Sequence, residues 1–351
     1  NSRNQLVRSA GTEAGKKCSE TVYTYDANGN CLTETKTQYD SNGNGDGGTA
    51  VLSASYDLHN QMVSARTAET YVRNTYNAQG FRVAKEVTTD GMASMSRFLY
   101  DGEHVIMEAD GDGAVTARNV YGGPLLFREV YSEAGAGDVD GNPERVTYSY
   151  LYNAHGDVVT LLSGREVIAT YAYDAFGNLT GQTGEADNSV LYAGYQYDVE
   201  TGLYYLNARM YDPVTARFLQ ADTYAGSQSD PLSLNLYTYC MNNPERYIDP
   251  SGHIAIELAV IVISAVVAGM AVEAGIQKFI EKKVCIDYNR IVGEGLFSGA
   301  VSAISFGTGN LLKCTIGPLA AKNALSTGTG LTAKTLAAAL IANAAGGAAS
   351  E

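Results

Sequence analysis

The unit that organises this chain reads Tyr173-Asp174-Ala175-Phe176-Gly177-Asn178, an aromatic residue followed by a polar turn that contains Gly. Residues 167–173 lead into this unit and end on its tyrosine. They read Val-Ile-Ala-Thr-Tyr-Ala-Tyr, which has the alternation and the residue types of a strand. Gly in such a turn supplies the positive φ that a tight hairpin needs. The unit therefore predicts a β-hairpin.

The same unit recurs along the chain. The clearest further copies are Tyr25-Asp26-Ala27-Asn28-Gly29-Asn30, Tyr76-Asn77-Ala78-Gln79-Gly80 and Tyr152-Asn153-Ala154-His155-Gly156-Asp157, and weaker copies begin at Tyr56, Tyr100, Tyr121 and Tyr197. From Tyr56 to Tyr121 successive tyrosines lie 20, 24 and 21 residues apart, the length of two short strands and two turns. The sequence therefore predicts a mainly β fold built from a train of β-hairpins.

The repeated tyrosines have two interpretations. They could form an aromatic platform on which glycans stack. Alternatively, each ring packs on the next hairpin and keeps its hydroxyl in water. We favour packing, because each Tyr stands at a fixed point of a repeated hairpin.

Composition divides the chain near residue 252. Residues 1–252 hold 32 acidic and 17 basic residues and 24 of the 25 tyrosines, whereas the remainder is nearly neutral. The formal net charge of −14 argues against a nucleic-acid partner for the repeat region, because phosphate contact needs a basic face. Two different kinds of polypeptide are therefore expected in this chain.

The sequence predicts no metal site and no cofactor. The five cysteines are widely spread without a CxxC spacing, and the four histidines are scattered. Residues 40–51 resemble the start of an EF-hand loop, but Val51 stands where a bidentate Glu is required. We expect this stretch and residues 133–142 to be surface loops.

Residues 192–252 carry a long ordered series of motifs. The series is Gly202-Leu203-Tyr204-Tyr205-Leu206-Asn207-Ala208-Arg209-Met210-Tyr211-Asp212-Pro213, Arg217-Phe218-Leu219-Gln220-Ala221-Asp222, Pro231-Leu232-Ser233-Leu234-Asn235-Leu236-Tyr237, Asn242-Asn243-Pro244 and Asp249-Pro250-Ser251-Gly252. It resembles the Rhs repeat-associated core domain, and the hairpin units resemble YD repeats. Together they are similar to Rhs-type polymorphic toxins, in a variant like those of Gram-positive bacteria, over roughly residues 20–252.

The resemblance implies three segments. Residues 1–191 would be YD repeats of a spiralling β-sheet shell, residues 192–252 a plug with autoprotease activity, and residues 253–351 an apolar, α-helical effector or pre-toxin segment. The shell would enclose this effector, and an immunity protein and a target-cell membrane would be further partners. The family is secreted or displayed at the cell surface and acts in interbacterial competition. Because Asn1-Ser2-Arg3-Asn4 lacks an initiator Met and a signal region, we expect a piece of a longer protein.

The resemblance also implies a single-turnover aspartyl autoprotease. Its carboxylates would be Asp222 and Asp249. Apart from the resemblance, Arg217 lies five residues before Asp222, and we expect it to orient or charge-balance a carboxylate through a bidentate contact. Two carboxylates hydrolyse a peptide bond when one is ionised and activates water while the other is protonated and donates. Cleavage would follow the second motif, between His253 and Ile254.

The two aspartate motifs differ in completeness. Asp249 is followed by Pro250, Ser251 and Gly252, which complete the second motif. Asp222 is followed by Thr-Tyr-Ala, without the Pro and Gly, and lies 27 residues before Asp249. The extra length falls in residues 225–230.

Other classes of function stay open. The chain could be a structural or adhesive cell-surface repeat protein whose second motif is only a turn. Residues 254–351 could form a membrane-active effector, because small-residue apolar stretches let helices pack closely in lipid. Their uncharged run at 258–272 is shorter than the roughly 20 residues of a spanning helix. The alternatives for this segment are a compact helical domain with a small-residue core and a hydrophobic stretch that a chaperone shields inside the shell.

Overall fold

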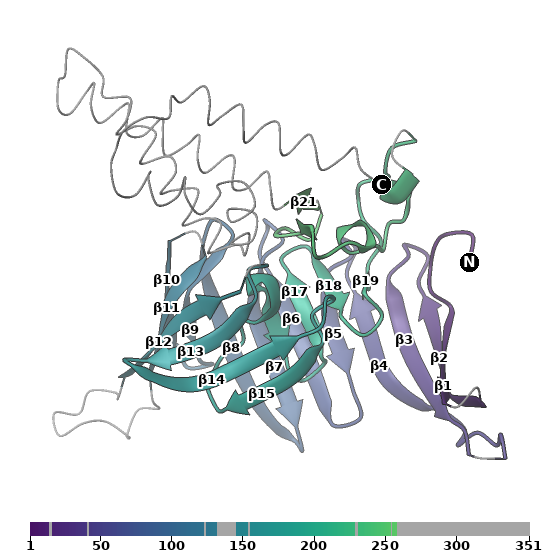
Figure 1. Cartoon of the computed structure of the whole chain (residues 1–351), viewed down its shortest axis with the longest axis horizontal. Coiled ribbons are helices and arrows are strands. Elements are labelled where there is room, and N and C mark those ends of the chain that lie inside the picture. The colour runs from purple at the N-terminus through teal and green to yellow at the C-terminus, as the bar shows by residue number, and fades with distance from the viewer. Residues whose placement is uncertain are drawn as a thin grey trace, which may run out of the picture.

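The computed structural model describes residues 1–13, 16–40, 42–122, 124–131, 145–153, 155–228, 231–253 and 255–257. Fifteen strands, β1 to β15, form one antiparallel sheet in chain order, and β16 to β19 form a second, four-stranded sheet. The large sheet curls around the small one (Figure 1). The mainly β fold and the train of hairpins predicted from the repeats are confirmed. Of the segment 253–351, which is expected to be helical, residues 256–257 form a short strand, and residues 258–351 lie outside the described residues.

The strands of the large sheet are short and regular. They are β1 (Arg8–Glu13), β2 (Lys16–Tyr25), β3 (Cys31–Gln38), β4 (Thr49–Tyr56), β5 (Met62–Arg66), β6 (Thr70–Tyr76), β7 (Arg82–Thr89), β8 (Met92–Asp101), β9 (His104–Ala109), β10 (Val115–Tyr121), β11 (Leu125–Tyr131), β12 (Arg145–Tyr152), β13 (Val158–Ser163), β14 (Glu166–Tyr173) and β15 (Leu179–Gly184).

The elements after the large sheet are shorter. They are the 3₁₀ turn η1 (Tyr192–Gly194), β16 (Gln196–Asp198), β17 (Leu203–Leu206), β18 (Arg209–Asp212), β19 (Arg217–Phe218), η2 (Pro231–Leu234), η3 (Cys240–Asn242), and the pair β20 (Tyr247–Ile248) and β21 (Ile256–Glu257). No helix in the described part of the chain is long and apolar enough to cross a membrane.

The turn after each repeat tyrosine is built by an Asp or Asn side chain. Oδ1 of Asp174 accepts the backbone N–H groups of Phe176 and Asn178, each at 2.9 Å. Gly177, the fourth residue of the turn, has a φ of +90°, which Gly adopts without steric cost. The turns at Asp57 and Asn77 accept N–H groups at the same two offsets. The hydrogen bonds that recur in these turns therefore join residues no more than four positions apart.

Seven of the repeat tyrosines stand at a β-bulge, whereas Tyr197 pairs in β16 without a register shift. The strand register shifts just before the tyrosine in seven hairpins, at Tyr25, Tyr56, Tyr76, Tyr100, Tyr121, Tyr152 and Tyr173. A bulge re-aims the side chain that follows it. Here the tyrosine hydroxyl reaches a backbone carbonyl of the preceding hairpin, for example from Tyr56 to Cys31 at 2.8 Å and from Tyr173 to Val158 at 2.9 Å.

The prediction that these hydroxyls stay in water is therefore wrong. The remaining tyrosines of the series donate to the carbonyls of Leu6, Met62, Arg82, Val105 and Leu125. A partly buried hydroxyl without an acceptor would destabilise the folded protein, and the bulge brings a carbonyl acceptor within reach of the hydroxyl. These bonds tie each hairpin to the one before it, as the packing interpretation requires.

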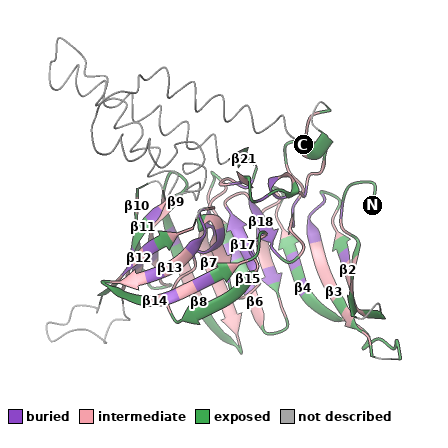
Figure 2. Ribbon diagram, viewed as in Figure 1, coloured by how far each residue is buried: buried purple, intermediate pink, exposed green. Residues whose placement is uncertain are grey.

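The small sheet is buried on both faces. All eight residues of β17 and β18 are buried (Figure 2). Leu203 and Met210 belong to a hydrophobic core with Met62 of β5, whereas Tyr204 and Tyr211 belong to a second core with residues of β12 to β14. The large sheet therefore supplies walls on two sides of the small one.

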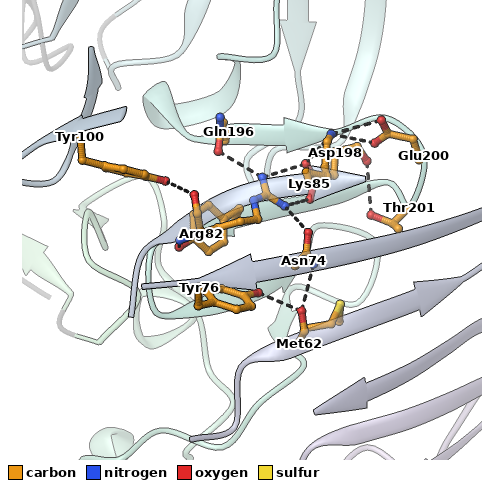
Figure 3. Close-up of polar contacts among 11 residues, drawn as sticks. Met62, Asn74, Tyr76, Arg82, Lys85, Tyr100, Gln196, Asp198, Glu200 and Thr201 are labelled. Carbon is orange, nitrogen blue, oxygen red and sulfur yellow. Dashed lines mark hydrogen bonds and ion pairs between the residues drawn. The ribbon is translucent and has the colours of Figure 1, made fainter. Parts of the chain in front are cut away.

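A buried ion network fastens the small sheet to the large one (Figure 3). Arg82 of β7 makes a bidentate contact with Asp198 of β16, with Nη1–Oδ2 at 2.5 Å and Nη2–Oδ1 at 3.0 Å. Nζ of Lys85 lies 3.1 Å from Asp198 and 3.1 Å from Glu200. Burial opposes ionisation of Asp198, but the charges of Arg82 and Lys85 outweigh it and lower its pKa to about 2.

Candidate active site

Asp222 is held by a turn that needs neither Pro nor Gly. The residue follows β19, and its N–H donates to the carbonyl of Leu236 at 3.0 Å. Its Oδ1 accepts the N–H of Tyr224 at 3.0 Å, which closes an Asx turn. The incomplete first motif therefore still presents its carboxylate in a defined direction.

Asp249 and the rest of the second motif lie against the β17–β18 hairpin. The N–H of Asp249 donates to Oη of Tyr195 at 3.0 Å, and the N–H of Ala208 donates to the carbonyl of Ser251 at 3.2 Å. Gly252 has a φ of +75°, and a Cβ on it would lie 2.3 Å from the carbonyl oxygen of Leu206. Only Gly fits this close approach, so the motif is more than an exposed turn.

Arg209, the first residue of β18, joins the two aspartates. Its Nη2 lies 2.7 Å from Oδ2 of Asp222 and 3.5 Å from Oδ2 of Asp249. Its Nε donates to the carbonyl of Gly252, and the guanidinium centre lies 3.6 Å from the ring centroid of Phe218. The side chain is 4% exposed. One buried cation therefore brings both predicted carboxylates together.

His253, the residue before the expected cut, contacts both aspartates. Its N–H donates to Oδ1 of Asp249 at 3.0 Å. Its Nδ1 lies 3.5 Å from Oδ1 of Asp222. The second residue of the expected cleavage site, Ile254, lies outside the described residues.

The charged groups of the site shift one another's pKa values, because they lie close together in a largely buried place. Burial raises the pKa of Asp222, but the hydrogen bond with His253 and the Arg209 charge outweigh it and hold the pKa below its ordinary value. Burial lowers the pKa of Arg209 despite the two aspartates.

Arg217 does not lie where the sequence analysis expected it. Its Nη1 donates to the backbone carbonyl of Asn4 at 2.8 Å, and its strand partner in β18 is Asp212. The arginine that contacts Asp222 is Arg209. The reason is register, because the β17–β18 hairpin places Arg209 beside both aspartate motifs, whereas Arg217 reaches toward the N-terminal residues.

One feature of the sequence points to Arg209, although the prediction above names Arg217. It is a charged residue within a run that reads as a buried strand, Arg209-Met210-Tyr211-Asp212. A buried charge requires a partner of opposite charge, so the search for that partner leads to the aspartates. Tyr195 carried no comparable signal, since nothing local links it to Asp249, 54 residues away.

Comparisons with known proteins agree with the motifs. No family model matches the chain. The tRNA3(Ser)-specific nuclease WapA of Bacillus spizizenii is 34% identical over 293 residues, which cover 71% of this chain and 11% of that protein. Toxin protein Tse5 of Pseudomonas aeruginosa is 27% identical over 57% of this chain and 16% of its own length. The chain thus spans less than a fifth of either relative.

A solved structure is also similar. The crystal structure of TcdB2-TccC3 matches 68% of this chain and 14% of its own, with a TM-score of 0.47 and 19% identity. The evidence for membership comes from the sequence identity to WapA, the YD-type repeats and the fifteen-stranded antiparallel sheet that they build. The chain belongs to the YD-repeat (Rhs-type) polymorphic toxin family.

Proposed function

We propose that residues 1–253 form part of a toxin shell with a single-turnover aspartyl autoprotease, which cuts between His253 and Ile254 and releases the segment that follows. One observation carries this proposal. The residue before the cut contacts Asp222 and Asp249, and Arg209 bridges the same two carboxylates. A carboxylate pair next to a peptide bond is the arrangement that acid–base hydrolysis needs.

The reaction assigns a different role to each aspartate. Ionised Asp222 takes a proton from a water molecule, whose oxygen bonds to the carbonyl carbon of His253. Protonated Asp249 gives its proton to the carbonyl oxygen, so that a tetrahedral diol forms. When the diol collapses, one of its hydroxyl protons passes to Asp249 and the proton on Asp222 passes to the nitrogen of Ile254 as the C–N bond breaks.

The lowered pKa of Asp222 keeps this carboxyl ionised, which is the state that the base of the pair must have. Arg209 touches both carboxylates and positions them. It also donates to the carbonyl of Gly252, which fixes the backbone one residue before His253. The products are a carboxylate at His253 and an amine at Ile254, and the site acts once because its substrate is its own chain.

The released segment and its partners are part of the proposal. We place the effector in the residues that follow His253, enclosed by the shell until cleavage. An immunity protein that neutralises the effector and a target-cell membrane complete the scheme, with the protein secreted or displayed at the cell surface. The relatives are a tRNA nuclease and a toxin by name, which supports a toxin role but leaves the activity of residues 254–351 unassigned.

The test compares the full chain with isosteric variants. Wild type, Asp222→Asn and Asp249→Asn are expressed, and the products are measured by intact-mass spectrometry. We expect a wild-type fragment that ends at His253 and a second that begins at Ile254. Each Asn variant should lose at least about 99% of the cleavage, because removing one group of a catalytic pair typically costs 10²-fold or more.

Asp112→Asn is the matched control. Asp112 is exposed in the turn after β9, so this variant should cleave like wild type. A wild-type chain that stays whole would support the structural or adhesive role instead. Cleavage that persists in both catalytic variants would assign it to another protease.

A further inference from the structure

His253 differs from the other groups of the site because it belongs to the substrate and can itself change charge. Its side chain is 41% exposed, so protons from solvent reach the ring. Histidine is the side chain whose charge ordinarily changes between about pH 5 and 8. The imidazole faces Asp222 directly, while the backbone of the same residue faces Asp249.

The imidazole and the attacking water need the same carboxylate. Oδ2 of Asp222 is taken by Arg209, and Oδ1 already accepts the N–H of Tyr224. The Nδ1 of His253 approaches that same Oδ1. A protonated imidazole forms a charge-assisted bond, which is stronger than a neutral one and weakens Asp222 as a base.

We propose that His253 gates its own cleavage: the protonated imidazole binds Asp222 and slows hydrolysis, and the neutral imidazole leaves Asp222 free to activate water. This inference rests on the autoprotease proposed above. It makes the residue before the cut a specificity determinant, because its side chain sets the pH range in which the chain is cut. Shell processing then depends on the pH of the compartment.

The other polar and charged groups around His253 are Asp249, Arg209 and Tyr195. Asp249 accepts the backbone N–H of His253, and Arg209 contacts both carboxylates and the carbonyl of Gly252. Tyr195 is fully buried and accepts the N–H of Asp249 through its hydroxyl. Arg209 keeps its charge over the physiological range and burial raises the pKa of Tyr195, so neither produces a step near neutral pH.

The test measures cleavage against pH in the full chain. The chain is made by a short cell-free translation pulse, moved to buffers between pH 5.5 and 8.0, and followed by the appearance of the fragment that begins at Ile254. In wild type we expect the rate constant to rise about tenfold from pH 5.5 to 7.5. His253→Gln should cleave without this rise, and the permanently cationic His253→Lys should cleave more slowly than His253→Gln throughout.

His59→Gln is the control, because His59 is an exposed turn residue far from the site in sequence and should leave the pH profile unchanged. If wild type cleaves and His253→Gln shows the same rise, or does not cleave at all, the gating inference is wrong and the autoprotease stands. If wild type does not cleave at any pH, the autoprotease itself is wrong and the inference falls with it.

Discussion

Buried carboxylates in this protein behave differently according to their partners. Asp198 is fixed by Arg82 and Lys85, which lower its pKa to about 2 against the effect of burial. Glu34 of β3 is half-buried and faces a different environment. Burial, together with the charge of Asp212, raises its pKa to about 8. The folded chain therefore binds a proton at Glu34 more tightly than the unfolded chain does.

The sign of the pH effect follows from this shift. A raised carboxyl pKa leaves stability unaffected below the unfolded value of about 4.3, and lowers it progressively as pH rises through about 8. We expect Glu34→Gln to unfold like wild type at pH 4.5 and to be more stable by on the order of 5 kcal/mol at pH 8, because each unit of the pKa shift corresponds to about 1.4 kcal/mol. Urea denaturation at several pH values measures this.

The comparison variant for Glu34 is Glu166→Gln, because Glu166 is exposed at the start of β14. Its stability difference from wild type should not change with pH. A Glu34→Gln difference that is equally flat would show that Glu34 ionises as freely in the folded chain as in the unfolded one.

Hairpins are joined by a recurring hydrogen bond from the hydroxyl of the tyrosine at a bulge to a backbone carbonyl of the preceding hairpin. The tyrosine at the end of β4 donates to the first residue of β3, and the tyrosine at the end of β14 donates to the first residue of β13. In two repeats an Asn two residues before the tyrosine bonds the same carbonyl, at Met62 and at Val105. The repeat thus carries its own means of attachment to the preceding unit.

Removing one hydroxyl tests this attachment. Tyr56→Phe and Tyr173→Phe keep the ring and lose the hydrogen bond, and we expect each to reduce the free energy of unfolding by about 1 kcal/mol. Thermal or urea denaturation measures the loss. Tyr224→Phe should change stability by less than about 0.5 kcal/mol, because Tyr224 is 54% exposed. Equal effects in all three would mean that the carbonyl contacts contribute no stability.

The large sheet and the small sheet share two cores and one ion network. The large sheet contacts both faces of β17 and β18, and Arg82 connects β7 to Asp198 of β16. The candidate active site lies on the same hairpin, because Arg209 is the first residue of β18. We therefore expect the docking of the small sheet and the geometry of the aspartate pair to depend on each other.

Breaking the network should affect both stability and cleavage. Arg82→Met leaves Asp198 buried without its bidentate partner, which we expect to cost about 3 kcal/mol. The double variant Arg82→Met/Asp198→Leu should recover most of this loss, because no charge then stays buried alone. Urea denaturation measures stability, and the fragment that begins at Ile254 reports cleavage.

A surface pair gives the comparison for Arg82. Arg145 of β12 lies 3.1 Å from Glu129 but is 58% exposed, so Arg145→Met should cost less than about 1 kcal/mol. If Arg82→Met is no more harmful than Arg145→Met, the network does not fasten the small sheet to the large one.

Short-range chemistry made much of the protein predictable from sequence. The hairpins, their Asp/Asn-Gly turns and the strand positions follow from residues within a few positions of each other, because turn geometry and strand alternation are local. The motif series also identified Asp222 and Asp249 as a pair. That prediction came from the resemblance of the motifs to a known family pattern, because no local signal links two residues that lie 27 positions apart.

Tertiary structure alone decided which groups meet those aspartates. Arg217 is nearer in sequence to Asp222, yet Arg209 contacts it, because the register of the small sheet and the walls of the large one set which side chains face inward. The carbonyl acceptors of the tyrosines and the contact of His253 with both carboxylates arise in the same way. Such contacts join segments that share no local pattern, and only the packing of the sheets determines their distances.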